Sequence, residues 1–161
     1  MKRILMLGLA LLVTACASTH VVTKPMEPVT ESSQAKYSVR SIEDKSENTV
    51  PEHFLEAIKG YLKAELKKRN MIADENSAPH WELAIQVTYY RMRSGFTRMM
   101  FGIMAGKDGV TSTVNVLNAK TGEVIGTCDV DTYNVLAVGG EQDVARMHAE
   151  EIANFLAEKQ K

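Results

Sequence analysis

Residues 81–89 read Trp-Glu-Leu-Ala-Ile-Gln-Val-Thr-Tyr, with a large apolar side chain at every second position. Successive side chains of a strand point to opposite faces, so this alternation predicts a strand with one buried and one solvated face. Residues 110–116 and 124–130 alternate in the same way, and the turn between them, residues 118–122, ends in glycine. These two stretches predict a hairpin, and residues 37–42 predict a fourth strand.

Two other segments have the spacing of amphipathic helices. From Phe54 to Leu66 apolar side chains recur three and four residues apart, and the same spacing runs through residues 141–159. Thr49 and Glu52 have the spacing of a capping box before the first of these helices. Asn70 suits the left-handed position that often ends a helix.

The element order is therefore strand, helix, three strands, helix. It predicts an α+β fold: a two-layer sandwich in which two helices cover one face of a four-stranded, mostly antiparallel sheet. Residues 37–161 are long enough for one domain of ordinary size and contain no internal repeat.

The amino terminus indicates a location. Lys2 and Arg3 precede an apolar run that is too short to span a bilayer. Residues 12–16, Leu-Val-Thr-Ala-Cys, resemble the bacterial lipoprotein signal. The resemblance implies that residues 1–15 are removed, that acyl chains such as palmitate are carried by Cys16, and, since Ala17 is not Asp, that the destination is the outer membrane. The alternative is an ordinary signal peptide with a chance cysteine. Residues 16–36, rich in Ser, Thr, Val and Pro, predict a flexible tether.

Little in the sequence points to catalysis. Removal of residues 1–15 lowers the formal charge from −1 to −3, which argues against a nucleic-acid partner. No phosphate loop, nucleophile motif or dinucleotide fingerprint is present. We therefore predict no metal, no cofactor and no enzymatic activity. An enzyme would need a cleft lined by candidates that we otherwise expect in the core or in solvent: His53, His148, Asp129 and Asp131. The remaining histidines, His20 and His80, also lack the spacing of metal ligands.

One segment, residues 91–109, has an unusual composition for a connection between two strands. It combines arginines and glycines with apolar side chains and is long for a small domain. It predicts a surface that contacts a protein partner, a second copy or a lipid surface. The alternative is a lid packed on the sheet. The predicted contact residues are Phe96, Met99, Met100, Phe101 and Met104.

Several of these features occur together in a known family. The lipoprotein signal, the glycine-rich stretch before Val110 and the Asn118–Gly122 turn resemble Gram-negative outer-membrane lipoproteins of unknown function, in which Asp is usual at the position of Asn118. More distantly, the element order is similar to the curli secretion lipoprotein and the amino-terminal domain of TolB. The resemblance implies a lipid-anchored, non-enzymatic binding or assembly domain in the periplasm with an envelope protein partner. The alternative is a self-assembling or export-associated subunit, a homo-oligomer, that uses residues 95–104.

The two interpretations of the apolar segment predict different outcomes for one double variant, Phe101→Ser with Met104→Ser. If the segment is a contact surface, the variant keeps its melting temperature and loses crosslinked partners, because a few apolar anchors dominate most interfaces. If it is a lid, stability falls by about 2–5 kcal/mol per deleted side chain. A variant unchanged in both measurements would contradict both interpretations.

Overall fold

The computed structural model describes residues 16–26, 35–74, 80–93, 106–134 and 140–158. Within these residues the chain forms five strands and two helices. In chain order they are β1 (Cys16–Lys24), β2 (Lys36–Asp44), α2 (Glu52–Lys68), β3 (His80–Arg91), β4 (Asp108–Asn118), β5 (Val124–Asn134) and α4 (Glu141–Glu158).

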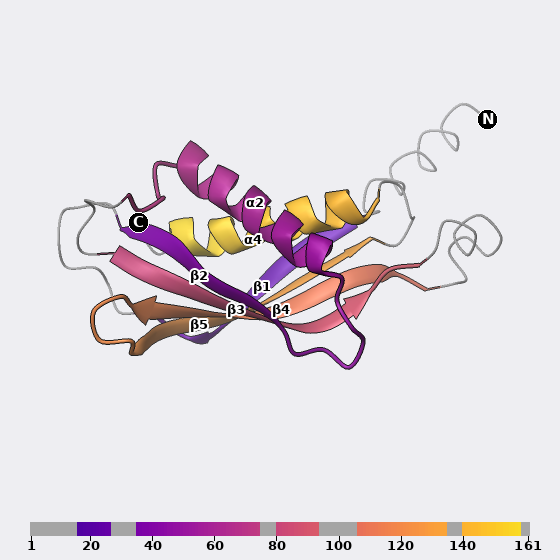
Figure 1. Ribbon diagram of the computed structural model, residues 1–161, viewed down its shortest axis with the longest axis horizontal. Helices are drawn as coiled ribbons and strands as arrows, with labels where there is room; N and C mark the ends of the chain where they lie inside the picture. Colours follow the sequence, from indigo (N-terminus) through magenta and orange to yellow (C-terminus); the bar gives the residue numbers. More distant parts are fainter. Residues whose placement is uncertain (1–15, 27–34, 75–79, 94–105, 135–139, 159–161) are drawn as a thin grey trace, which may run out of the picture.

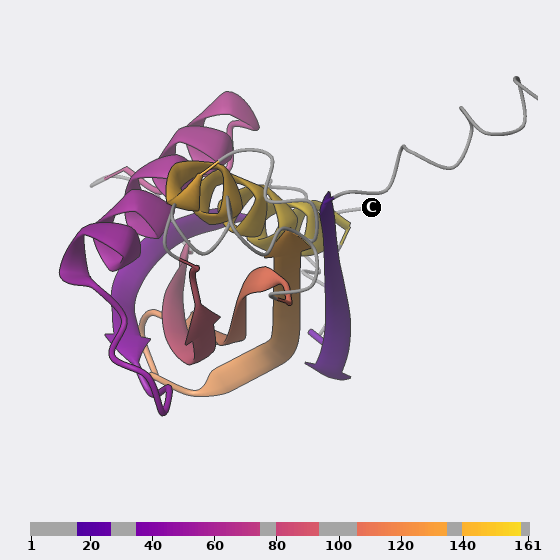
Figure 2. The same cartoon turned by 90° about the vertical axis from the view of Figure 1, so that its right-hand side faces the viewer.

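The strands make one sheet in the order β1-β5-β4-β3-β2, and both helices lie across the same face of it (Figure 1). Viewed from the end, the sheet curves so that the helices lie on its concave side (Figure 2). The predicted α+β sandwich with two helices on one face is confirmed, but the sheet has five strands rather than four. Among the described residues, no helix is long and apolar enough to cross a membrane.

The additional strand, β1, corrects the predicted tether. Residues 16–24 pair antiparallel with β5, from Cys16 opposite Asn134 to Lys24 opposite Thr127. The reason is visible in the sequence Ser-Thr-His-Val-Val-Thr at 18–23, which is rich in β-branched residues and has no turn former before Pro25. After β1, Met26 packs over Gly126, where a Cβ atom would collide with the Met26 side chain. Residues 16–24 are therefore part of the sheet.

The sheet is mixed. β1–β5, β5–β4 and β4–β3 are antiparallel pairs, whereas β2 and β3 are parallel. Parallel neighbours need a crossover connection, and α2 supplies it. The prediction of a mostly antiparallel sheet is therefore correct, as is the hairpin between β4 and β5, in which Gly122 adopts a positive φ of 73°.

The core lies between the concave face of the sheet and the two helices. Alternate residues of β3, Leu83, Ile85 and Val87, are fully buried, as their spacing predicted. The apolar stripes of the helices meet them. The buried helix residues are Phe54, Ile58, Leu62 and Leu66 of α2, and Val144, Ala145, His148, Ala149, Ile152, Ala153, Phe155 and Leu156 of α4.

The two ends of α2 differ in how well the sequence predicted them. Asn70 takes the left-handed conformation with φ 56°, and the Met71 amide donates to the Leu66 carbonyl at 2.7 Å, as expected for this helix ending. The capping box is wrong, because Pro51 occupies the N-cap and no side chain caps the helix. Instead, the preceding loop is held by Asp44, whose carboxylate accepts from the Val50 amide at 2.9 Å.

The buried stripe of α2 leads to a matched pair of variants. Leu62→Ala should lower the free energy of unfolding by about 2–5 kcal/mol, because it deletes a fully buried side chain. Lys63→Ala, on the exposed side of the same helix, should change it by less than about 0.5 kcal/mol. Chemical denaturation measures both values, and equal small losses would contradict this packing.

Candidate functional site

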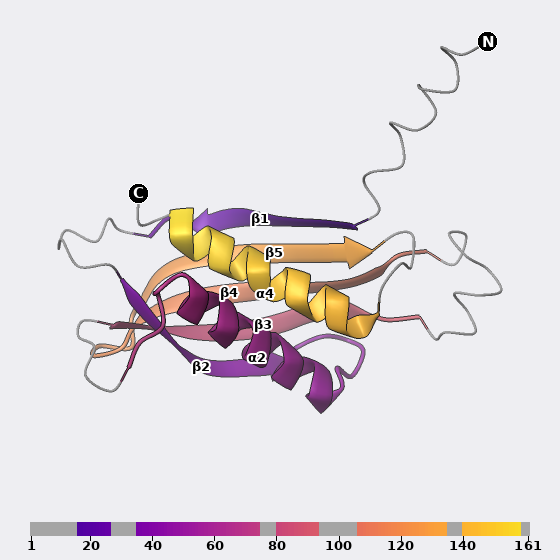
Figure 3. The same cartoon turned by 90° about the horizontal axis from the view of Figure 1, so that it is seen from above.

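The predicted lipid-attachment residue lies at one end of the sheet. Cys16 is the first residue of β1 and stands opposite Asn134, the last residue of β5. On its other side Asn134 stands opposite Asp108, the first residue of β4. By this register the three residues form a row across the sheet. We name this part of the molecule, where the arrow of β5 ends in Figure 3, the Cys16 end. The predicted contact residues between Phe96 and Met104 lie outside the described residues.

A buried ion pair joins β4 to the end of β3 close to this row. The Asp108 carboxylate accepts from the Arg93 backbone amide at 2.8 Å and from Nε of the Arg93 guanidinium at 2.9 Å. The side chains are only 3% and 1% exposed. Removing one partner of such a pair would leave a buried charge uncompensated, which is strongly unfavourable. The pair therefore holds together the two points at which the chain leaves β3 and enters β4.

Two exposed basic residues lie beside this ion pair. Arg91 is the last residue of β3, and its guanidinium packs against Gly106, which has a positive φ of 89°. Lys107 directly precedes β4 and places its ammonium 4.2 Å from the centre of the Tyr133 ring, a cation–π contact. Both Arg91 and Lys107 are exposed at the Cys16 end, whereas Arg93 is buried in its ion pair with Asp108.

His148 is a core residue. It is fully buried, and its ring lies between two hydroxyl groups: Nε2 is 2.7 Å from Ser112 Oγ and Nδ1 is 3.0 Å from Thr132 Oγ1. Thr132 is in turn 2.7 Å from Ser18 Oγ of β1. Burial lowers the pKa of His148 to about 3, so the ring is neutral and uses one nitrogen as donor and the other as acceptor. The network connects α4 to three strands, including β1.

A second histidine, His20, joins β1 to α4. His20 Nδ1 is 2.8 Å from Glu151 Oε1 and Nε2 is 3.3 Å from Glu158 Oε2, both on α4. The sequence placed His20 in a tether, so this contact was not predicted. The only sequence signal for it was the β-branched run around His20. β1 is therefore fixed to the domain by Ser18, His20 and the adjoining Met26.

The other candidate residues have structural or solvent contacts. Asp129 and Asp131 accept from the hydroxyls of Thr113 at 2.7 Å and Thr111 at 3.0 Å on the face of the sheet opposite the helices. His53 is largely exposed and lies 3.3 Å from Glu141. The side chain of His80 lies outside the described residues. Within the part of the chain that the structure describes, no three His, Cys, Asp or Glu side chains are placed to hold a metal ion.

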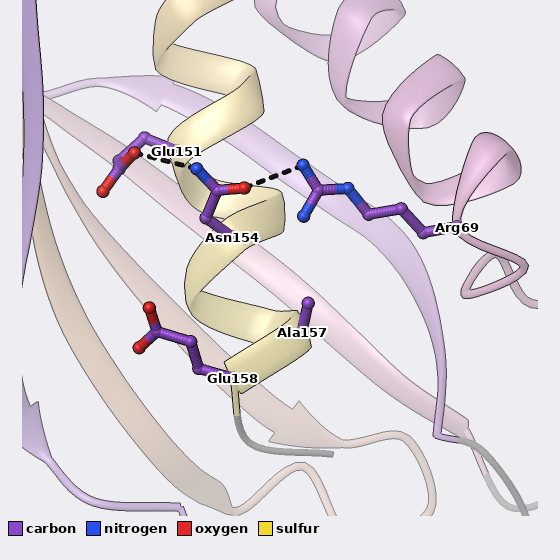
Figure 4. A pocket seen from close by; sticks show the side chains of 5 residues that line it. All are labelled: Arg69, Glu151, Asn154, Ala157 and Glu158. Carbon is purple, nitrogen blue, oxygen red and sulfur yellow. Dashed lines mark hydrogen bonds between the residues drawn. The ribbon is translucent and has the colours of Figure 1, made fainter. Parts of the chain in front are cut away.

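A shallow depression of about 310 Å³ lies between the carboxyl-terminal parts of α2 and α4. Its side chains contact one another (Figure 4): Arg69 Nη2 donates to Asn154 Oδ1 at 2.8 Å, and Asn154 Nδ2 donates to Glu151 Oε2 at 3.1 Å. With Ala157 and Glu158 these residues complete its lining. The hydrogen bonds join the two helices, so we regard the depression as part of the helix interface.

Comparison with known proteins places this α+β domain in a family. The model of the family described as Domain of unknown function (DUF4410) matches residues 23–139. The chain belongs to this family. No curated protein matches it.

Solved structures share the fold. A PelC dodecamer from Paraburkholderia phytofirmans superposes with a TM-score of 0.59 at 17% identity, covering 89% of this chain and 98% of that chain. A dodecamer of a substituted form of the same PelC gives a TM-score of 0.56 at 16% identity, covering 90% and 97%. At these identities the likeness concerns the fold.

The neutral state of His148 predicts how stability depends on pH. The pKa of this side chain is about 3 in the folded protein and 6.5 in the unfolded chain, so the unfolded chain binds the extra proton between these values. Its contribution to stability is complete above pH 6.5 and is lost as the pH falls. From pH 7.5 to pH 5 the loss should be about 2 kcal/mol.

His148→Gln, which keeps hydrogen-bonding groups and does not titrate, serves as the control. Denaturation of both proteins at the two pH values should show a smaller loss in the variant. An equal loss in both would mean that other groups cause the pH dependence.

Proposed function

We propose that this protein is a lipid-anchored subunit of the bacterial envelope and that its domain acts by assembly rather than by catalysis. The lipid is carried by Cys16, the membrane is the outer membrane, and the domain lies in the periplasm. The sequence of the lipoprotein signal supports the anchor. The observation that carries the assembly role is that β1 forms an edge of the sheet that no other described element covers.

The two edges of the sheet are protected differently. The outer side of β2 is partly covered, because Tyr37 bridges to Ile72 and exchanges backbone hydrogen bonds with Met71 and Ala73. β1, by contrast, packs only on β5 and α4 among the described elements. Val21 is 63% exposed. Proline and formally charged residues, which usually protect an edge, are absent from Cys16 to Thr23, and the protecting lysine and irregular pairing of β1 occur only at its last residues, from Val22 to Lys24. Such an edge favours the addition of a strand from another chain.

We propose a second copy of the chain as one partner, because PelC, which has this fold, is a dodecamer. The lipid restricts how copies can associate. If two β1 strands paired antiparallel about a two-fold axis, their Cys16 residues would lie about 27 Å apart along the strands, and the lipids could not enter one leaflet without tilting the pair. A ring in which the edge of one copy meets a different surface of the next keeps every Cys16 on the same side.

The contacts of the ionisable residues support a non-catalytic role. His148 contacts Ser112 and Thr132 in the core, and Arg93 is bound to Asp108. Each of these groups stabilises an element rather than facing a cleft. The apolar residues from Phe96 to Met104 remain a proposed contact surface on the strength of the sequence.

The anchor is tested by Cys16→Ser. The variant should lose metabolic labelling with palmitate and move from the membrane to the soluble fraction, because the domain offers no membrane-spanning helix among its described residues. Blocked processing is monitored on the same gel by the size of the precursor. A processed variant that still sediments with membranes would refute the lipid anchor.

Assembly is tested with Val21→Lys. A charge on an exposed edge strand opposes the addition of another strand, so crosslinked oligomers of the full-length protein should fall to monomers while the melting temperature stays the same. Val124→Lys is the matched control. It changes a 37% exposed valine at the start of β5 rather than on β1, so it should leave the oligomers intact. A wild-type protein that is monomeric in crosslinked envelopes would contradict self-assembly.

A further inference from the structure

We propose that in the assembly the β1 flank of one copy docks against the α2 flank of the next copy through complementary charges. The β1 flank consists of β1 with Glu151 and Glu158 of α4, and the α2 flank is the exposed side of α2 that carries Lys63 and Lys67. This proposal rests on the self-assembly proposed above and names the surface that receives the edge formed by β1.

The two flanks lie on opposite sides of the domain. β1 and β2 are the two edges of the sheet, and α4 packs on β1 whereas α2 packs on β2. The end view shows β1 on one side of the molecule and α2 on the other (Figure 2). A ring needs two different surfaces in this arrangement, because each copy contacts one neighbour on either side.

The β1 flank carries a negative charge. Glu151 and Glu158 both contact His20, at 2.8 Å and 3.3 Å between the nearest oxygen and nitrogen atoms. Because an imidazole carries at most one positive charge, it cannot neutralise both carboxylates. Residues 16–23 of β1 add no Lys or Arg, and the Glu158 side chain is 58% exposed. Both carboxylates lie on the side of α4 that is turned away from Arg69 and α2 (Figure 4).

The α2 flank carries a positive charge. Lys63 and Lys67 are about one helical turn apart, and both are exposed. Neither forms a hydrogen bond or an ion pair with another described residue. Tyr61, which reaches Gln142 of α4 at 3.3 Å, precedes the two lysines by about 200° and 240° around the helix. The lysines therefore face away from α4, where a neighbouring copy can reach them.

The opposite charges lie at a similar height along the two helices. α2 and α4 lie side by side and run in the same direction (Figure 3). Arg69 donates to Asn154 at 2.8 Å, and Lys67 and Glu151 precede this contact by about 3 Å and 4.5 Å along their helices. Rotation about an axis parallel to the strands keeps every residue at its height. The carboxylates of one copy then face the lysines of the next, and every Cys16 stays on one side of the ring.

Charge reversal on the α2 flank tests the contact. Lys63→Glu should weaken association of the full-length lipidated protein in detergent micelles by about fivefold or more, because an attraction becomes a repulsion. Sedimentation velocity measures the oligomer fraction without a lysine-reactive crosslinker. Lys120→Glu, at an exposed residue of the turn between β4 and β5, changes the net charge equally and is the matched control. Its oligomers should persist, and both variants should keep the melting temperature of the parent.

An exchange of charges identifies the partner flank. Glu158→Lys alone should also dissociate the oligomer. The double variant, Lys63→Glu with Glu158→Lys, should restore it, because opposite charges again face each other across the contact. A double variant that keeps the parental melting temperature but stays dissociated would refute this pairing of flanks.

The parent protein separates the two proposals. A parent that is monomeric in the micelles would refute self-assembly itself. A parent that is oligomeric, with a Lys63→Glu variant that is equally oligomeric, would refute the contact between the flanks and leave self-assembly intact.

Discussion

The burial of one face of the sheet is the constraint on which the rest of this structure depends. Strands β3, β4 and β5 each place alternate apolar side chains on the same side, and that side must be kept from water. Helices α2 and α4 provide the cover, with Leu62 and Ile152 among the residues that meet the sheet. Fully burying one such side chain contributes about 1.5–3 kcal/mol, so the paired faces account for much of the driving force for folding.

Because the helices occupy only one face, the other face remains polar and the sheet retains its edges. The polar face is satisfied by hydrogen bonds between neighbouring strands, such as Thr113 to Asp129. The edge of β5 is covered by β1, which is fixed by His20 and by the network that reaches His148 through Thr132. β1 in turn becomes the exposed edge. In this way a requirement of the sheet determines where residues 16–24 must lie.

In the proposed function, the position of β1 joins anchoring to assembly. A tether would have left the domain free to rotate relative to the membrane, and its copies could have met in many orientations. An anchor on the first residue of a paired strand removes most of that freedom. In the proposed function, copies that share a leaflet are then pre-oriented, which lowers the entropic cost of their association.

The sequence by itself determined the elements whose pattern is local. Alternation predicted β3 and the β4–β5 hairpin, helical spacing predicted the buried stripes of α2 and α4, and Asn70 predicted the end of α2. The tertiary structure decided what depends on residues far apart in the chain. Because β1 is exposed, its sequence lacks a clear alternation of apolar and polar residues. It is recognisable as a strand only through its pairing with β5. The partners of His20 and His148 likewise lie in distant segments, and Arg93 binds Asp108 across the connection between β3 and β4. Cys16 was recognisable from the signal before it, but its place in a row with Asn134 and Asp108 follows from strand register, which local sequence does not specify.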